Sequence, residues 1–552
     1  MTVISIKILL ITYFLIFTNF GLEQRVEQIG VNLNLLLFFA LWVLIILSIF
    51  AVSFYGTLNA RIFWGLFFSL SAVLGSIYYQ SSGGQYLSFN TIAPIWDAKG
   101  NIFDALILYQ FIVIKSIINS FAGLIGIIIP STINKKPIKF TGLIPLAPII
   151  LISFIIFIRG GEGTGGLPSQ LIPLTTFSVY MGDNLLNQES PSREQVSISI
   201  YQQPIINNIV LVVDESVRAD YLKINDNKKG VDTGLSNSNH IANFGWSSAS
   251  TSCSIYSNLG LMYGGNKKAT VNIIRTKPSI WAYAKSAGFE TYFIGGQKLT
   301  PDDNKWIDYN HIDYVTTNGD LINDDPNLID YEIARKTKKI INANNNNKLI
   351  YVIKRGSHFP YESRYPDHQA IFSPHMSEGS VFSPQNTVNE RADLVINSYK
   401  NSVQWNTGIF FKEYFSEKLK HSTALFYTSD HGQKLKSEDN TSFFTHCNTA
   451  MVSPFEGLVP LVIATNDLAL HQLFYDAAKR NYDKSGHLNI FPTILWTLGY
   501  NVKDINQHYA QSLLDDIEGI QQFVSPPFFT KFGRKQKLNS IPKRGITAII
   551  PP

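Results

Sequence analysis

The sequence is poor in several residue types, and each shortage limits what the protein can be. Only two cysteines occur among 552 residues, Cys253 and Cys447, so at most one disulfide can form. A bridge would suit an exported domain, whereas two buried free thiols are the alternative, and the sequence leaves both open. Charged residues make up 16% of the chain, and a net charge of +5 without a basic stripe gives no sign of a nucleic-acid partner.

Charge is scarcest in the first 160 residues, where uncharged apolar runs are long enough to cross a bilayer as helices. We expect five spans, at about residues 8–22, 33–55, 62–80, 104–130 and 141–159. The first run lacks the small residues of a signal-peptide cleavage site, so we interpret it as an anchor. The fourth contains Asp104 and Lys115, and an amphipathic helix at the membrane surface is its alternative.

Loop charges predict how this anchor is oriented. With the N-terminus in the cytoplasm, the inner side receives the basic residues Lys7, Arg61, Lys135, Lys136 and Lys139. The outer loops show no basic excess, and their charged residues are Glu23, Arg25, Glu27, Asp97 and Lys99. Five spans then place everything after Arg159 outside the cytoplasm.

The rest of the chain alternates apolar strands with helices. The expected strands are 208–214, 290–296, 348–356, 423–430 and 458–465, and the main expected helices are 278–288, 328–343 and 390–419. Strands that are apolar on both faces and separated by helices indicate a mainly parallel sheet flanked by helices. We therefore expect a transmembrane domain at 1–160, a Gly-rich connector at 161–204, an α/β domain at 205–520, and an irregular basic tail at 521–552 that is solvated or touches anionic lipid.

Carboxylates and imidazoles recur where the expected strands end. They are Glu215, His358, Asp430, His431 and His446. Each one alone has an ordinary alternative role, such as helix capping. Because the carboxyl ends of parallel strands meet at one edge of a sheet, we expect these side chains to gather there. Oxygen and imidazole ligands together suit zinc or manganese, with one position left open for substrate.

These residues lie in motifs that resemble those of a known family. "DESVRA" (214–219) resembles a G-E-T-x-R-A block, and "TSDHG" (428–432) resembles an S-D-H-G block. Both blocks belong to the membrane-anchored phosphoethanolamine transferases that modify lipopolysaccharide. That family includes the mobile colistin-resistance enzymes and is part of the alkaline phosphatase and sulfatase superfamily. The resemblance covers the anchor and nearly all of 205–515, and implies an α-helical transmembrane anchor joined to an alkaline-phosphatase-like α/β domain.

The resemblance also implies a metal site. Glu215, Asp430 and His431 match ligands of zinc, as one ion or two, with Mn²⁺ or Mg²⁺ as alternatives. The stretches "GSHFPYESRYP" (356–366) and "FTHC" (444–447) make His358 and His446 ligands of a second metal or of the transferred phosphate. "GHLNIFPTIL" (486–495) resembles the H-x-N/D-x-F-x-T segment of the superfamily.

The nucleophile of the family is a threonine that opens a helix in the pattern T-S-T-A-x-S-x-P-C. Laid on "ASTSCSIYSN" (249–258), the threonine falls on Thr251 and the inner serine on Ser254. A hydroxyl becomes a nucleophile when a metal activates it, so Thr251 would be both catalytic and a metal ligand. If the alignment is shifted by one residue, Ser250 or Ser252 would be the nucleophile instead.

This sequence departs from the family at several positions. Tyr256 and Ser257 replace the proline and cysteine, and Gln433 replaces a frequent glutamate after S-D-H-G. Asp214 stands where the family has glycine, either supporting the site or exposed, and Arg218 packs or pairs nearby. These departures indicate a distant branch.

The function implied is transfer of phosphoethanolamine from phosphatidylethanolamine to lipopolysaccharide, at lipid A or the core, through a phospho-threonine intermediate. The resemblance also implies an enzyme of a bacterial inner membrane with its catalytic domain in the periplasm. Its product would weaken the binding of cationic antimicrobial peptides to the outer surface of the cell. The alternatives are a phosphoglycerol transferase acting on a periplasmic glycan, a phosphodiesterase, and a non-catalytic lipid-binding relative. A sulfatase is excluded because "CSIYS" around Cys253 lacks the Pro and Arg of C/S-x-P-x-R.

Overall fold

The protein is described here by a computed structural model whose residues fall into two compact units, Met1–Glu189 and most of the chain from Ser190 onward. The described residues are 2–82, 84–97, 102, 106, 109–130, 138–186, 193–237, 240–266, 269–298, 306–321, 325–376, 392–435, 446–447, 452–519, 521–526, 528 and 535–544. Lys99, Asp104, Lys135 and Lys136, which entered the predicted spans and orientation, lie outside them.

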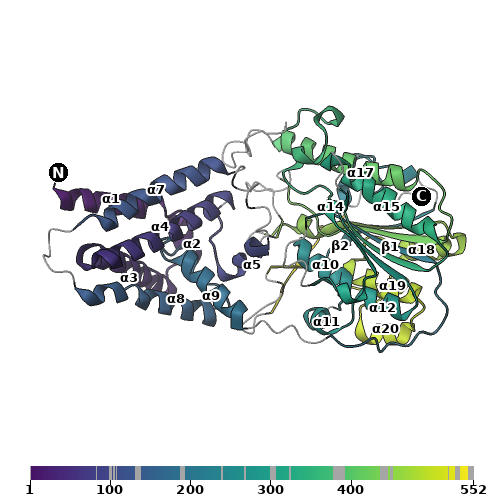
Figure 1. The fold of residues 1–552 in the computed structure, drawn as a ribbon, viewed down its shortest axis with the longest axis horizontal. Coiled ribbons are helices and arrows are strands. Elements are labelled where there is room, and N and C mark those ends of the chain that lie inside the picture. Colours follow the sequence, from purple (N-terminus) through teal and green to yellow (C-terminus); the bar gives the residue numbers. More distant parts are fainter. Residues whose placement is uncertain are drawn as a thin grey trace. The chain divides into compact units, whose positions relative to one another are not determined.

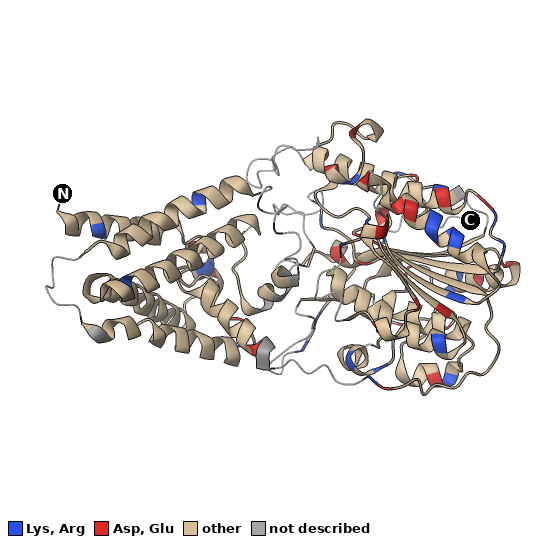
Figure 2. Cartoon of the chain, viewed as in Figure 1, with Lys and Arg blue, Asp and Glu red and all other residues tan. Residues whose placement is uncertain are grey.

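The first unit is a bundle of apolar helices (Figure 1). These helices are α1 (Val3–Phe17), α2 (Leu22–Ile29), α3 (Leu33–Tyr55), α4 (Leu58–Ser81), α5 (Phe89–Asp97), α7 (Gln110–Ile128), α8 (Leu146–Ile158) and α9 (Ile172–Leu186). Among the described residues four helical segments are long and apolar enough to span a membrane, or five if α1 and α2, bent by 59°, form one span. Charged side chains are sparse along them (Figure 2). The predicted anchor of about five spans is therefore confirmed.

Two cations close one end of this bundle. Lys7 Nζ donates to the carbonyls of Ile127 (3.1 Å) and Ile129 (2.7 Å), and Arg61 Nη1 donates to those of Ile128 (3.1 Å) and Ile129 (2.9 Å). The last carbonyls of a helix have no partner within the helix and carry partial negative charge, so cations stabilise them. Lys7 and Arg61 thus lie at the same end of α7, as the predicted orientation requires.

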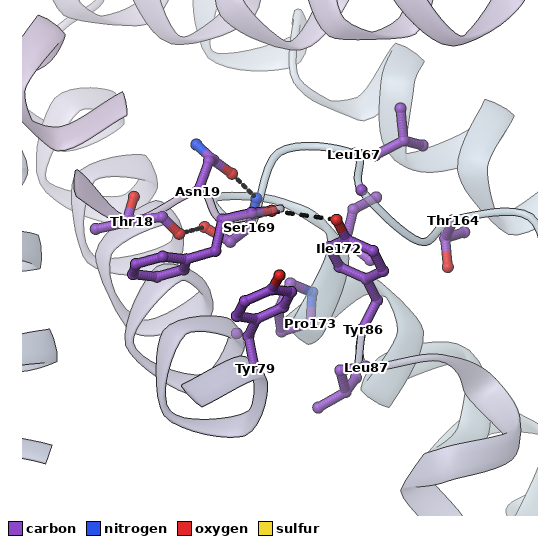
Figure 3. Close-up of a pocket in the computed structure, with 13 residues that line it drawn as sticks. Thr18, Asn19, Tyr79, Tyr86, Leu87, Thr164, Leu167, Ser169, Ile172 and Pro173 are labelled. Carbon is purple, nitrogen blue, oxygen red and sulfur yellow. Dashed lines mark hydrogen bonds between the residues drawn. The ribbon is translucent and has the colours of Figure 1, made fainter. Parts of the chain in front are cut away.

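A small pocket lies near the other end of α1, and polar bonds surround it (Figure 3). Ser169 N–H donates to Asn19 Oδ1 (2.7 Å), and Ser169 Oγ donates to the carbonyl of Thr18 (2.6 Å). Tyr86 donates to the carbonyl of Phe20 (3.2 Å). The two Ser169 bonds attach the segment between α8 and α9 to the bundle. The range 161–204, expected to be only a connector, therefore contributes a helix and a packed loop to the anchor.

The second unit is built on a seven-stranded sheet with the order β2-β7-β6-β1-β5-β3-β4. The strands are β1 (Asn208–Asp214), β2 (Ile241–Ser248), β3 (Glu290–Gly295), β4 (Tyr314–Thr316), β5 (Lys348–Ile353), β6 (Thr423–Ser429) and β7 (Leu458–Thr465). Pairing is parallel from β4 to β6 and antiparallel for β7 and β2. The mainly parallel sheet is as predicted, and all five expected strands are present. β2 and β4 correspond to none of the expected strands.

Helices cover both faces of this sheet (Figure 1). They are α10 (Ser254–Tyr263), α11 (Thr270–Thr276), α12 (Ile280–Ser286), α14 (Asn318–Leu321), α15 (Ile329–Ala343), α17 (Ala392–Tyr414), α18 (Leu468–Arg480), α19 (Ile490–Thr497) and α20 (Val502–His508). Every residue of β1, β5, β6 and β7 is buried. This two-sided burial explains why these strands are continuous apolar runs in the sequence.

A C-terminal hairpin pairs β8 (Gln522–Ser525) with β9 (Lys537–Ser540). Val524 N–H donates to the carbonyl of Ser250 (2.9 Å), and Ser252 N–H donates to that of Val524 (3.2 Å). Phe523 is fully buried. The described part of the tail is therefore ordered and belongs to the second unit, in contrast to the irregular segment that we expected.

A buried ion pair joins the ends of two central strands. Lys354, which follows β5, places Nζ 2.5 Å from Asp214 Oδ2 and 3.4 Å from Asp330 Oδ2, and all three side chains have no exposed area. Thr407 and Tyr427 donate hydrogen bonds to the same Asp214 oxygen. A charge buried this deeply needs such partners. Asp214 is therefore a structural group within the core and is not exposed.

We expect Lys354→Ala to lower the free energy of unfolding by roughly 3–5 kcal/mol, because it leaves Asp214 charged and buried without its counter-ion. Lys223→Ala is the matched control, since its ion pair with Asp232 is exposed and worth about 1 kcal/mol or less. Denaturant unfolding of the full chain in detergent measures both. Equal effects of the two substitutions would contradict the structural role given to Lys354.

Candidate active site

The site begins where β1 and β6 end. Their parallel register pairs Asp214 with Ser429, so the next residues, Glu215 and Asp430, leave the sheet side by side. Both side chains are about 1% exposed. Asp430 N–H donates to the carbonyl of Asp214 (2.8 Å), which continues the pairing one residue beyond the strands.

A strained turn then fixes the carboxylates. Ser216 has a φ of 61°, a left-handed conformation that is uncommon for a residue with a side chain. Its N–H donates to Asp430 Oδ1 (2.9 Å), its hydroxyl donates to Glu215 Oε1 (2.7 Å), and Tyr399 donates to its carbonyl (2.8 Å). These bonds compensate the backbone strain, which is typical of functional sites.

The loop that carries His358 lies in close backbone contact with Glu215. A Cβ added to Gly356, whose φ is 56°, would lie 2.6 Å from Glu215 N, so only glycine allows this approach. Ser357 N–H donates to the carbonyl of Glu215 (2.9 Å). Gln297, after β3, holds the other side of Glu215 by donating from Nε2 to Oε2 (2.9 Å).

Three side chains could hold a metal ion together. Ligand atoms of Glu215, His431 and His446 all lie within 4.8 Å of one another. His431 Nε2 is 3.5 Å from Glu215 Oε1 and 3.5 Å from Asp430 Oδ2. Asp430 Oδ2 is buried and accepts no hydrogen bond from the described residues. A buried carboxylate oxygen in this state suits a cation as its partner. Carboxylate and imidazole donors of the kind expected for a metal site therefore lie together here.

The imidazoles are oriented as metal ligands are. Nδ1 of His431 lies 2.6 Å from the carbonyl of Gly432, and Nδ1 of His446 lies 3.1 Å from Gln433 Oε1. Nδ1 of His358 lies 2.5 Å from the carbonyl of Phe359. Oxygens of this kind only accept, so Nδ1 carries the proton in each ring and Nε2 keeps its lone pair. Partners of this type commonly set the tautomer of histidines that bind metals.

The electrostatics also favour a cation. Burial, with the nearby charge of Glu215, raises the pKa of Asp430 well above its ordinary value. Burial alone would raise the pKa of Glu215, but the positive charge that His431 and His358 carry when protonated, together with a hydrogen bond from Asp430, lowers it. Asp430 therefore holds its proton more tightly than Glu215 does, and a bound metal ion would displace that proton.

Burial favours the neutral form of the two stacked histidines. The ring centroids of His431 and His446 are 4.0 Å apart. Burial lowers the pKa of both, and the facing rings of His431 and His358 add to the effect on His446. Neutral imidazole is the form that binds metals.

Ser254 places a hydroxyl beside a histidine of this cluster. It is the first residue of α10, after the N-cap Cys253, and its Oγ lies 3.1 Å from His431 Nε2. Because Nδ1 of His431 carries the proton, Ser254 is the donor in this bond. The first-turn amides of α10 are also suited to bind phosphate oxygens.

Thr251 is placed differently from Ser254. Its Oγ1 donates to the carbonyl of Cys253 (2.9 Å) and accepts from Cys253 N–H (3.0 Å), and it lies 3.3 Å from Ser257 Oγ. The hydroxyl of Thr251 is therefore bonded to Cys253 and Ser257 rather than to a carboxylate or imidazole of the cluster. Ser254, three residues later, fits the family pattern equally well. In this alignment Ser254 takes the place of the threonine and Ser257 takes the place of the inner serine, with the same spacing between them. An estimate of where α10 begins would have favoured this register.

The two cysteines form a disulfide, Cys253–Cys447. This decides between the two alternatives that the sequence left open.

Arg218 is fully buried, pairs with Asp220 (2.6 Å), and donates to the carbonyl of Gln433 (3.1 Å).

His487 lies beside the site in a structural role. Its Nδ1 accepts from Ser250 N–H (3.1 Å), and its Nε2 donates to the carbonyl of Ser429 (2.8 Å). Burial lowers the pKa of His487 to about 3, so the ring is neutral. It connects the loop before Ser254 to the end of β6. Gln297 belongs to no motif that the sequence offered, whereas the motif included Ser254 only as the inner serine.

Comparisons with known proteins agree with this arrangement. The model of the sulfatase family matches residues 207–500, more than half of the chain. Kdo(2)-lipid A phosphoethanolamine 7''-transferase of Salmonella typhimurium is 24% identical over 335 residues, covering 56% of this chain and 55% of the relative. The Escherichia coli enzyme of the same name is 24% identical over 315 residues, covering 54% and 52%. The chain thus matches these curated relatives over about half of their length.

A solved structure has the same overall architecture. The integral membrane protein lipooligosaccharide phosphoethanolamine transferase A of Neisseria meningitidis aligns with a TM-score of 0.64 at 15% identity, covering 92% of this chain and 98% of that one. The predicted fold class, a helical membrane anchor with an alkaline-phosphatase-like domain, is confirmed. Because the family model covers more than half of the sequence, this protein belongs to the sulfatase family.

Proposed function

We propose that the protein transfers phosphoethanolamine from phosphatidylethanolamine to a lipopolysaccharide acceptor. The observation that carries the proposal is Ser254 at the start of α10, 3.1 Å from a histidine of a buried carboxylate–imidazole cluster. Relatives named as lipid A phosphoethanolamine transferases support the reaction class. The sequence around Cys253 lacks the residues for sulfate-ester chemistry, so membership of the sulfatase family does not make it a sulfatase.

The metal would be zinc, held by Glu215, Asp430 and His431, with His446 facing the same space. When bound, the ion supplies positive charge that favours the ionised hydroxyl and the phosphoryl oxygens. Gln297 and Ser216 keep the Glu215 oxygens in place by hydrogen bonds. Such supporting bonds tune metal affinity.

Ser254 would be the nucleophile in place of Thr251. Its oxygen forms a bond to the phosphorus of the donor lipid while the bond from phosphorus to the diacylglycerol oxygen breaks. The first-turn amides of α10 orient the phosphoryl oxygens. His358 and His446 border the same space, their ring centroids 5.7 Å apart. Their imidazoles would take the proton of the Ser254 hydroxyl and pass it to the departing diacylglycerol oxygen.

The second step returns Ser254 to its starting state. An acceptor hydroxyl or phosphate oxygen bonds to the phosphorus, and the bond from phosphorus to Ser254 Oγ breaks. Donor and acceptor both reside in membranes, which gives the apolar anchor a direct purpose. The protein would be a multi-pass inner-membrane enzyme with its catalytic unit in the periplasm, and the added amine would reduce the negative charge that attracts cationic peptides.

Mass spectrometry of surface glycolipids from cells with and without the protein tests the function. We expect a phosphoethanolamine group on lipid A or core sugars only when the protein is present. A phosphoglycerol group on a glycan would instead indicate the alternative transferase, and an unchanged glycolipid profile would contradict both.

Ser254→Ala should reduce transfer at least about a thousandfold, because it removes the attacking oxygen. Ser254→Thr keeps a hydroxyl and should recover part of the rate. Thr251→Ala is the matched control and should retain at least about a tenth of the activity, since Thr251 hydrogen-bonds within its loop. Intact-protein mass spectrometry with labelled donor locates the intermediate, and a labelled Thr251 in Ser254→Ala would return the role to Thr251.

Removal of metal should abolish transfer, and added Zn²⁺ should restore it. Glu215→Gln and Asp430→Asn each remove a charged ligand, so we expect about 10-fold or greater loss of zinc affinity. Lys223→Ala, an exposed substitution, is the control. Metal content of the purified full chain, measured beside activity, checks this prediction. Full activity of a preparation shown to hold no metal would rule out the metal-dependent reaction.

A further inference from the structure

The disulfide joins two residues that flank the proposed catalytic groups. Cys253 directly precedes Ser254, and Cys447 directly follows His446. The Cα atoms of the two cysteines are 4.7 Å apart, and the Cα atoms of Ser254 and His446 are each one peptide unit, about 3.8 Å, from that of the adjacent cysteine. A single covalent bond therefore holds the proposed nucleophile near a histidine of the cluster, although the cysteines are 194 positions apart in sequence.

The loop on the Ser254 side is fixed independently of this bond. Ser250 N–H donates to His487 Nδ1 (3.1 Å), its carbonyl accepts from Val524 N–H, and Ser252 N–H donates to the carbonyl of Val524. Ala249 N–H donates to the carbonyl of Gly457 (2.8 Å). The loop is therefore tied to β8 and to the core of the sheet before the disulfide is considered.

The described contacts on the His446 side lead back to the site itself. Cys447 N–H donates to the carbonyl of Ser252 (2.9 Å), and His446 Nδ1 donates to Gln433 Oε1 (3.1 Å). The His446 ring stacks on His431. Each of these is a non-covalent contact of modest strength. The loop before Ser254 is thus fixed by its own hydrogen bonds, and the disulfide positions His446 relative to that loop.

We propose that the Cys253–Cys447 disulfide is a positioning element for His446, and that full metal affinity and full transfer activity require its oxidised form. This inference rests on the proposed function of the same site. It also gives the lone pair of cysteines a catalytic purpose in addition to any effect on stability.

The redox step is an ordinary thiol–disulfide exchange. A dithiol reductant attacks one sulfur, the Cys253–Cys447 bond breaks, and the second thiol of the reductant releases the other cysteine. Two electrons and two protons pass to the cysteines, and the reductant leaves as its own disulfide. A disulfide oxidant reverses the reaction, as is usual outside the cytoplasm. The site would therefore be completed only on the oxidising side of the membrane.

A double-mutant cycle on the purified full chain tests the proposal. The variants are Cys253→Ala with Cys447→Ala, His446→Ala, and the combination of all three. Zinc affinity, measured by competition with a chromophoric chelator, is the primary readout, and transfer rate is the second. We expect removal of the disulfide to weaken zinc binding about 10-fold or more, and His446→Ala to do the same. In the His446→Ala background, removal of the disulfide should cost nothing further.

If removal of the disulfide lowers zinc affinity by the same factor with and without His446, the proposal is overturned, because the disulfide then acts independently of His446. Phe474→Leu in α18 is the control for lost stability: it truncates a buried core side chain and should lower the unfolding temperature while leaving zinc affinity unchanged.

Reduction of the folded protein avoids any failure of the variants to fold. Dithiothreitol should produce two free thiols and the same loss of zinc affinity, and oxidation should restore it. Two free thiols with unchanged affinity would refute the inference. Failure of the proposed function gives a different result, since the oxidised protein would then bind zinc tightly and still transfer no phosphoethanolamine.

Discussion

The backbone hydrogen bonds that set the register of β1 against β5 and β6 determine the rest of the site. They pair Val213 with Ile353 and Asp214 with Ser429, so the three strands end together and Glu215, Lys354 and Asp430 follow at one edge. A slip of one residue would turn every side chain of β1 to the other face of the sheet. A slip of two would move Glu215 by about 6–7 Å along the strand, well beyond ligand distance.

This register gathers more negative charge at one place than a protein interior tolerates alone. The structure surrounds these carboxylates in two different ways. Asp214 receives a fixed counter-ion, Lys354, and two hydroxyl donors, and so becomes part of the core. Glu215 and Asp430 receive neutral imidazoles, whose lone pairs cannot compensate a negative charge. One pair is thus complete within the protein, and the other is left for a cation and substrate.

The sequence predicts much of this because the governing patterns are local. The apolar runs of the anchor and of β1, β3, β5, β6 and β7 are visible without structural information. Glu215, Asp430 and His431 follow directly at strand ends, so their meeting could be predicted from a parallel sheet.

The remaining features depend on contacts between distant segments. The pattern "ASTSCSIYSN" accepts two registers with equal spacing, and β8, far along the chain, fixes the loop that lets α10 begin at Ser254. β2 lacks a continuous apolar run, and β8 is only four residues long. Gln297 belongs to no motif, and its role depends on the proximity of β3 and β5. Pairing of Cys253 with Cys447 likewise needed the fold.

The bonds from Val524 to the loop before Ser254 have a consequence for biosynthesis. The carbonyl of Ser250 and the N–H of Ser252 find their partners in a strand that follows them by more than 250 positions. A nascent chain that has not yet emerged past residue 525 therefore leaves these two groups without these partners, and the loop before Ser254 is incomplete. Folding of the candidate site thus waits for the synthesis of β8, although every carboxylate and imidazole of the site precedes that strand in the sequence.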